Sequence, residues 1–322
     1  MSVRRFAVLF FVIILATPPA LAQDYPTRPI KVVVALSAGG VVDLIARLLS
    51  PKLSETFKQP VVVENKPGGS GIPGYDSVAK SSADGHTLLL GTTGLVMMHN
   101  FFPKLPFDPR RDFAPITIVA DSPAVLVVHG SVPAHNLKEL VGLAKASPGK
   151  YYYGSSGNGG IFHLSGELLK SQSGIDIVHV PYKGNARAMV DLLSGQVQIL
   201  FANPPDVLAH IKAGKLRPIV WTGSRRTPLL PEVPTVAEAG MANAEAKAFF
   251  ALVAPTGTPK HVIARLNAET VRVLKMPEIT GRLVEVGLDP IGSTSEQAQA
   301  FMRSEEVKWA KVIKESGAKV DN

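Results

Sequence analysis

The sequence predicts an α/β fold built from two doubly wound lobes, and two observations carry this prediction. Short runs rich in valine, isoleucine and leucine alternate with longer amphipathic stretches, which is the pattern of a sheet covered by helices. This pattern restarts near the middle of the 322 residues, and a chain of that length favours two domains over one. We therefore expect two α/β lobes within one chain.

The first block contains three candidate strands, at residues 30–36, 61–64 and 87–91. These runs lack polar alternation, which is typical of parallel strands that helices cover on both faces. Between the first two, apolar residues recur at intervals of four, which predicts a helix over residues 41–58. The residues of this stripe are Ile45, Leu49, Leu53 and Phe57.

The second block repeats the pattern, and the C-terminal part is expected to return to the first lobe. Further strands are predicted at 124–128, 151–154, 178–180, 197–201, 217–222 and 248–254, and helices at 137–146, 260–275 and 295–316. We place the two crossings between the lobes near residues 122–125 and 247–251. Residues 23–123 and 248–322 are then expected to form lobe 1, and residues 124–247 to form lobe 2.

The first 22 residues have the layout of a cleaved secretory signal. Arg4 and Arg5 precede an apolar run over residues 6–16, and the small-x-small triplet Ala20-Leu21-Ala22 follows two prolines. A membrane anchor is the alternative, but this run is well short of the roughly 20 residues that span a bilayer. We expect cleavage after Ala22 and export to the periplasm.

Composition excludes several classes of protein. The chain has no cysteine, which rules out disulfides and thiolate metal sites, and no His-x-x-x-His pair occurs, so we expect neither a metal nor another cofactor. The formal net charge is +8, and removing residues 1–22 with Arg4 and Arg5 leaves about +6. The basic residues are spread singly along the chain, which indicates a solvated surface and no nucleic-acid partner.

Small and polar residues follow four of the predicted strands. Ligand sites in open α/β sheets lie at the carboxyl ends of strands, so we expect these loops to share one cleft. Helix N-termini attract anions, and hydroxyl groups donate to carboxylate oxygens. The loops therefore favour capture of a small carboxylate. The candidate residues are Ala38, Gly39, Gly40 and Asp43, then Thr92 and Thr93, then Ser155, Ser156, Asn158 and His163, and finally Ala202 and Asn203.

Some of these residues have structural alternatives. Asn203 precedes Pro204 and has the pattern of a helix N-cap, so its side chain could serve only its own helix. Asp43 is equally suited to capping a helix and to contacting a ligand. His163 is more often a packed, hydrogen-bonded histidine than a catalytic one.

The hypothesis that the same loops form the active site of an enzyme is the least favoured. A serine hydrolase would use Ser155 or Ser156 with His163, but Asn158 stands where a nucleophile elbow around Ser156 has its second glycine. Neither a phosphate loop nor a dinucleotide fingerprint occurs. We therefore expect a binding protein.

At these loops the sequence resembles a known family, the tripartite tricarboxylate transporter substrate-binding proteins, also called Bug or TctC-like extracytoplasmic receptors. The resemblance covers essentially the whole chain after the signal. Among the matching stretches are Val61-Val62-Val63-Glu64-Asn65-Lys66-Pro67-Gly68, Asp84-Gly85-His86-Thr87-Leu88, Tyr153-Gly154-Ser155-Ser156-Gly157-Asn158-Gly159 and His179-Val180-Pro181-Tyr182-Lys183-Gly184.

The resemblance implies a type II periplasmic-binding-protein fold with a ligand cleft between the lobes, which closes by a hinge motion. It implies a carboxylate held by Ala38, Gly39, Gly40 and Asp43, by Thr92 and Thr93, and by Ser155, Ser156, Asn158 and His163. The expected role is a monomeric receptor that delivers an organic acid to a membrane permease of the tripartite tricarboxylate type. The alternative is a ligand-loaded adaptor for a sensor histidine kinase.

Two positions depart from the family pattern. Family members usually carry an aspartate before the asparagine of the fourth loop, where this chain has Ala202. Without that acid the sequence favours a plain mono- or dicarboxylate, or an aromatic acid, over an amino acid. The first loop reads Leu36-Ser37-Ala38 in place of an aromatic residue followed by proline, which leaves the size of the ligand open.

Overall fold

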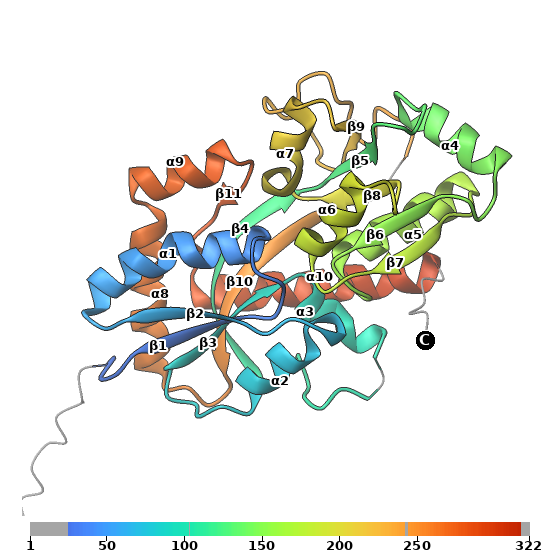
Figure 1. Ribbon diagram of the computed structural model, residues 1–322. Helices are drawn as coiled ribbons and strands as arrows, with labels where there is room; N and C mark the ends of the chain where they lie inside the picture. The colour runs from blue at the N-terminus through green and yellow to red at the C-terminus, as the bar shows by residue number, and fades with distance from the viewer. Residues whose placement is uncertain (1–24, 103, 242–243, 317–322) are drawn as a thin grey trace, which may run out of the picture.

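The computed structural model describes residues 25–102, 104–241 and 244–316, and these residues form two α/β lobes (Figure 1). The predicted secretory signal, residues 1–22, lies outside the described residues. No helix in the described ranges combines the length and apolar character needed to span a membrane.

One sheet belongs to each lobe. The strand order is β11-β4-β10-β3-β1-β2 in the first sheet and β7-β6-β8-β5-β9 in the second. The strands are β1 (Ile30–Val34), β2 (Val61–Asn65), β3 (Thr87–Thr92), β4 (Phe113–Pro123), β5 (Val125–His129), β6 (Tyr152–Ser155), β7 (Val178–Pro181), β8 (Ile199–Ala202), β9 (Leu216–Trp221), β10 (Lys247–Pro255) and β11 (Asp289–Pro290).

Helices surround both sheets. They are α1 (Val41–Phe57), α2 (Ile72–Ala79), α3 (Gly94–Met97), α4 (Leu137–Ala146), α5 (Ile161–Ser173), α6 (Asn185–Leu193), α7 (Pro204–Lys212), α8 (Lys260–Leu274), α9 (Pro277–Glu285) and α10 (Ser295–Ser316), with short 3₁₀ helices at Gly69–Gly71 and Met98–Asn100. The predicted helical stripe is confirmed, since Ile45, Leu49, Leu53 and Phe57 are all buried in α1.

The α/β prediction is confirmed, and the three strands of the first block are parallel as expected, since β1 pairs in parallel with both β2 and β3. The sequence did not indicate that each sheet also contains antiparallel strands. β10 runs antiparallel to β3 and β4, and β5 runs antiparallel to β8 and β9. These two strands are the ones by which the chain enters each lobe after a crossing. Such a strand starts beside the other lobe and runs away from it, whereas its direct neighbours in the sheet, β3 and β4 or β8 and β9, run the opposite way. The two-residue strand β11 is also antiparallel to β4. The direction of β5 and β10 therefore follows from the crossings and not from the residue pattern.

The structure also contains a long strand that the sequence did not suggest. β4 runs from Phe113 to Pro123 and pairs with both β10 and β11. Pro115, Thr117 and Asp121 interrupt its apolar run, and such residues weaken a strand pattern. Burial between neighbours stabilises the strand despite that composition, because Ile116, Ile118 and Val119 are almost fully buried.

The two crossings meet at one buried hydroxyl group. β4 passes into β5 through Ala124, and the returning chain reaches β10 through Ala246. Thr222 Oγ1 accepts a hydrogen bond from Ala124 N at 2.7 Å and lies 2.5 Å from the carbonyl oxygen of Ala246. Thr222 is 1% exposed. This side chain therefore ties the two connecting segments together.

The lobes also touch through loops at the edge of the interlobe space. The backbone N–H and the hydroxyl of Ser37 both donate to the carbonyl oxygen of Lys183, at 3.1 and 2.7 Å. A second contact between the lobes joins two rings: the centroid of Phe101 lies 5.6 Å from that of His163. Helix α10 packs against β4 and α3 and extends to α5 of the second lobe. The structure thus shows a closed arrangement.

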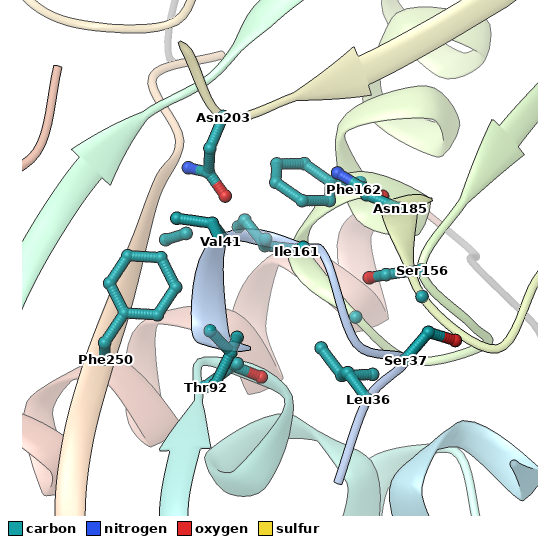
Figure 2. Close-up of a pocket in the computed structure, with 15 residues that line it drawn as sticks. Leu36, Ser37, Val41, Thr92, Ser156, Ile161, Phe162, Asn185, Asn203 and Phe250 are labelled. Carbon is teal, nitrogen blue, oxygen red and sulfur yellow. The ribbon is translucent and has the colours of Figure 1, made fainter. Parts of the chain in front are cut away.

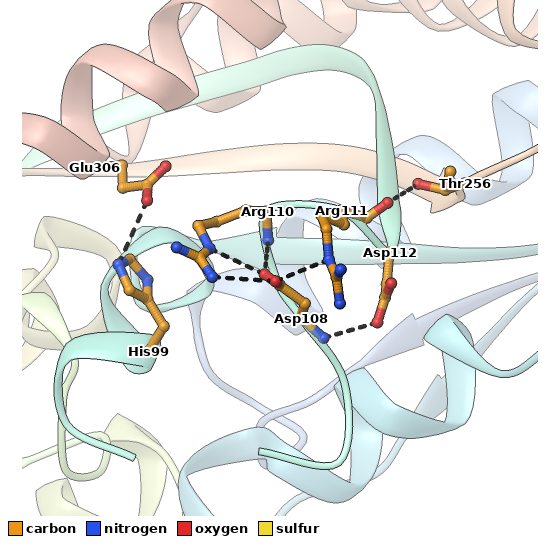
Figure 3. A network of polar contacts seen from close by, with 7 residues as sticks. All are labelled: His99, Asp108, Arg110, Arg111, Asp112, Thr256 and Glu306. Atoms are coloured by element: carbon orange, nitrogen blue, oxygen red, sulfur yellow. Dashed lines mark hydrogen bonds and ion pairs between the residues drawn. The ribbon is translucent and has the colours of Figure 1, made fainter. Parts of the chain in front are cut away.

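A separate polar network stabilises the loop before β4 (Figure 3). Asp108 accepts hydrogen bonds from Arg110 and is paired with Arg111 at 2.9 Å. The hydrogen bond from Arg110 holds the pKa of Asp108 low, at about 2. Thr256, just beyond β10, donates to the backbone oxygen of Arg111. The charged side chains of this loop are therefore paired with one another and stabilise its conformation.

Candidate ligand-binding pocket

A pocket of about 490 Å³, including its opening to solvent, lies where the two lobes meet. The carboxyl ends of β1, β3, β6 and β8 converge on it, as expected for an α/β site. Figure 2 shows side chains from both lobes around one space. The lining residues are Leu36, Ser37, Gly40, Val41, Val42 and Thr92, Ser156, Gly160, Ile161, Phe162, Gly184, Asn185 and Asn203, and Ala248 and Phe250.

Two helix N-termini, one from each lobe, border this pocket. α1 begins after Gly40 and α5 after Gly160, and neither N-cap residue supplies a side-chain hydrogen bond. The preceding glycines, Gly39 and Gly159, have φ values of 83° and 74°, which favour glycine. First-turn N–H groups have no acceptor within their helix, and the helix dipole makes this end positive. The pocket is therefore suited to an anion.

Asp43 shapes the first of these loops from within. Its carboxylate accepts the N–H of Gly39 at 3.0 Å and the Nε–H of Arg47 at 2.9 Å, and its side chain is buried. Burial alone would raise the pKa of Asp43, but the hydrogen bonds from Arg47 and Gly39 outweigh it and hold the pKa below its ordinary value. Asp43 lies beside the pocket, outside its lining, as do Ala38 and Gly39.

The two threonines after β3 occupy different surroundings. Thr92 lines the pocket. Thr93 is fully buried, and its Oγ1 accepts the backbone N–H of Phe249 at 2.9 Å, so it joins the loop to β10. Of these two adjacent residues, Thr92 therefore lines the pocket, and Thr93 supports the loop behind it.

The third loop is divided in the same way. Ser156 lines the pocket, and Asn158 lines a smaller hollow of about 320 Å³ beside it. Ser155 is fully buried, with Oγ 2.7 Å from His179 Nε2. His163 is also buried, and its Nδ1 accepts the N–H of Gly159 at 3.2 Å.

The geometry at Ser155 opposes its use as a nucleophile. Its hydroxyl donates to the carbonyl oxygen of Gly157 at 3.1 Å. Nδ1 of His179 has no hydrogen-bond partner among the described residues, so the network assigns the ring proton to Nε2, which then donates to Ser155. A general base must accept the serine proton. Here His179 is a donor, and Ser155, which it contacts, is fully buried and does not line the pocket.

The fourth loop presents one side chain. Ala202 is completely buried in the core of the second lobe, whereas Asn203 lines the pocket. Asn203 precedes α7 but makes no side-chain cap. Its Nδ2 lies 3.5 Å from the carbonyl oxygen of Ser122, and its oxygen points toward Val41 in Figure 2. The capping alternative is thus not what the structure shows.

Several lining residues were not anticipated from the sequence. Gly184 and Asn185 lie three and four residues after the end of β7, so the rule that selected the other four loops could have found them. Phe162 lies in the first turn of α5, and Phe250 lies within β10. No local sequence signal distinguishes Phe250 from its buried neighbour Phe249, because only the register of β10 decides which ring borders the pocket.

Asp206 of the second lobe contacts the N-terminus of α1 in the first. Its carboxylate accepts hydrogen bonds from Val41 N–H and from Asn185 Nδ2, the latter at 3.2 Å. Burial raises the pKa of Asp206 to about 6, although these two hydrogen bonds act in the opposite direction. The ionised side chain therefore carries an uncompensated desolvation cost in the closed arrangement.

This cost predicts how stability changes with pH. An elevated folded-state pKa means that the penalty is absent well below the ordinary value of 3.8, develops toward pH 6 and is complete above it. We expect Asp206→Asn to raise the free energy of unfolding by about 2 kcal/mol at pH 8. The gain should nearly vanish at pH 4. Urea unfolding of both proteins across this range measures it, and a difference that does not change with pH would contradict the interpretation.

The fold and the pocket define a class of protein: a two-lobed solute-binding protein with its site between the lobes. Residues 45–318 match the model of the tripartite tricarboxylate transporter family receptor. The chain belongs to this family, as its resemblance in sequence implied.

Individual relatives agree with this assignment. The protein BugT of Bordetella pertussis is 37% identical over 304 residues, which cover 94% of this chain and 93% of BugT. A structure of R. palustris Rpa4515 with adipate is 36% identical, with a TM-score of 0.89 and coverage of 92% of this chain and 100% of that one. MatC from Rhodopseudomonas palustris with bound malate is 30% identical, with a TM-score of 0.84 and coverage of 90% and 100%.

Proposed function

We propose that this receptor captures a small carboxylate and delivers it to a permease of the tripartite tricarboxylate type. The observation that carries the proposal is that the N-termini of α1 and α5 lie on opposite sides of one pocket, and neither has a side-chain cap from its own N-cap residue. At α1 the first N–H, that of Val41, already donates to Asp206, which leaves the following N–H groups of that turn for a ligand. A carboxylate between the two N-termini would accept N–H groups from both lobes and so favour closure. Adipate and malate in two family structures support a ligand of this chemistry.

The lining suggests how such a ligand lies. The first-turn N–H groups after Gly40 and Gly160 and the hydroxyls of Thr92 and Ser156 supply donors to the carboxylate. Asn203 provides a further polar contact. The remaining candidates act from behind the lining: Asp43, Thr93, Ser155 and His163 hold the loops in place, as their hydrogen bonds indicate.

The body of the ligand would contact an apolar surface. Val41, Ile161, Phe162 and Phe250 lie around the same space. No aspartate or glutamate is among the described residues that line it. The carboxylate of Asp206 lies behind the lining and is already bonded to Val41 and Asn185, so an ammonium group would find no free counter-charge there. With Ala202 in the core, this lining supports a plain organic acid over an amino acid.

The wider role remains part of the proposal. We propose a monomer in the periplasm, exported through the signal at residues 1–22, with lobe 1 formed by residues 23–123 and 248–322 and lobe 2 by residues 124–247. The strands of the two sheets lie within these ranges except that Lys247 already begins β10. The buried Ser155 and the donor role of His179 support binding without catalysis.

A thermal-shift screen of the mature protein tests the proposal. Ligand at 100 times its Kd stabilises a protein by about 2.7 kcal/mol, so at least one mono- or dicarboxylate is expected to raise the Tm by several degrees. Amino acids and neutral sugars at equal concentration serve as comparisons. Stabilisation by sugars alone would refute a carboxylate receptor.

A further inference from the structure

A stack of three buried rings lies behind the third loop of the pocket. The ring of His179 lies 4.8 Å from that of Tyr153 and 4.3 Å from that of His163, with interplanar angles of 30° and 26°. All three side chains are buried, and none of them lines the pocket. The stack therefore cannot contact a ligand there directly.

Hydrogen bonds connect this stack to the loop that does line the pocket. His179 Nε2 lies 2.7 Å from Ser155 Oγ, which also accepts the N–H of Gly157 at 3.2 Å and donates to the Gly157 oxygen at 3.1 Å. A parallel connection runs from His163 Nδ1 to the N–H of Gly159 at 3.2 Å. Both tethers end on glycines of the short loop that leads into α5.

The loop needs such tethers because its backbone is otherwise unusually free. Gly157 and Gly159 have φ values of 134° and 74°, and glycine loses more conformational freedom on ordering than any other residue. Only a fixed loop keeps the first-turn N–H groups of α5 aimed at the pocket, and groups ordered before binding cost less affinity.

The histidine acts as a neutral donor. Burial is the main cause that lowers the pKa of His179, to about 3, and electrostatic interactions with His163 and Lys170 act in the same direction. The ring is therefore uncharged at neutral pH, and its contribution to the site is through its hydrogen bond and its packing.

We propose that His179 is a positioning residue for ligand capture: through Ser155 it fixes the backbone of Gly157 and thereby the N-terminus of α5. This inference rests on the proposed function for its effect on affinity. His179 itself lies outside the pocket lining.

Two substitutions separate the hydrogen bond from the packing. His179→Phe keeps a ring in the stack but removes the donor, whereas His179→Gln keeps an N–H group at similar reach. We expect the phenylalanine variant to bind the carboxylate found in the thermal-shift screen about 10-fold more weakly, and the glutamine variant to remain within about 3-fold of the native protein. Equal losses in both variants would overturn the proposal.

A double variant tests whether the effect passes through Ser155. If it does, His179→Phe combined with Ser155→Ala should bind no more weakly than the worse single variant. Losses that multiply would show two independent effects and overturn the proposed connection.

Hydrogen exchange of the Gly157 amide gives a readout that needs no ligand. We expect about 10-fold faster exchange in His179→Phe than in the native protein and little change in His179→Gln. Unchanged exchange in both would refute the positioning role, even if a carboxylate binds. If exchange changes as expected but no carboxylate binds the native protein, the positioning role stands and the proposed function fails.

Discussion

Replacing Gly184 by alanine is expected to weaken ligand binding about 100-fold, or about 2.7 kcal/mol. Gly184 lines the pocket on the second lobe, at a φ of 134° that side-chain-bearing residues rarely adopt. A Cβ atom here would lie 3.1 Å from the backbone nitrogen of Ser37 and 3.4 Å from its Cβ and Oγ, all in the first lobe. The contact joins the two lobes, so we expect the substitution to act against closure and hence against capture.

Gly214→Ala is the matched control for this prediction. Gly214 also lies in the second lobe and has a positive φ of 69°, but a Cβ atom there would meet no atom within 4 Å. We expect this variant to lose about 1 kcal/mol of stability through backbone strain and to bind its ligand normally. Calorimetric titration of both variants measures the difference. Equal affinity losses would show that backbone strain, and not the contact with Ser37, is responsible.

Thr222→Val is expected to lower the free energy of unfolding by about 2–4 kcal/mol. The two side chains have nearly the same shape, so the change removes a hydroxyl without opening a cavity. It leaves the buried N–H of Ala124 without its acceptor and removes the contact with the Ala246 oxygen. Each buried polar group left unpaired costs about 1–3 kcal/mol.

Thr222→Ser provides the comparison, because it retains the hydroxyl and removes only a methyl group. Chemical denaturation should find the serine variant within about 1 kcal/mol of the native protein and the valine variant well below it. If valine is tolerated as well as serine, the hydroxyl does not join the two crossing segments as the structure indicates.

The regular elements were largely predictable because burial imposes a period on the sequence. The helix predicted at residues 137–146 has those bounds in the structure, since its apolar spacing and its N-cap residue, Asn136, agree. The parallel direction of β1, β2 and β3 was predicted correctly, but the direction of β5 and β10 was not predictable, because their apolar composition is the same whether they run parallel or antiparallel. Only the positions of the two crossings, a property of the whole chain, decide their direction.

The candidate site was predictable to the extent that strand ends determine it. Gly40, Thr92, Ser156 and Asn203 come from the four selected loops, and all line the pocket. A loop motif does not reveal which side chain of a neighbouring pair faces inward. Ser155 and Ser156 are adjacent in sequence, yet one binds His179 and the other borders the pocket, because successive residues at a strand end point in opposite directions.

The most direct test of the central claim is an NMR titration of the ¹⁵N-labelled mature protein with the carboxylate that stabilises it most. If the ligand lies between the two helix N-termini, the largest amide shift changes should fall on Val42, Ile161 and neighbouring first-turn residues. Both lobes should respond at the same ligand concentration. Shift changes confined to one lobe, or centred on the loop around Asp108, would contradict a carboxylate site between α1 and α5.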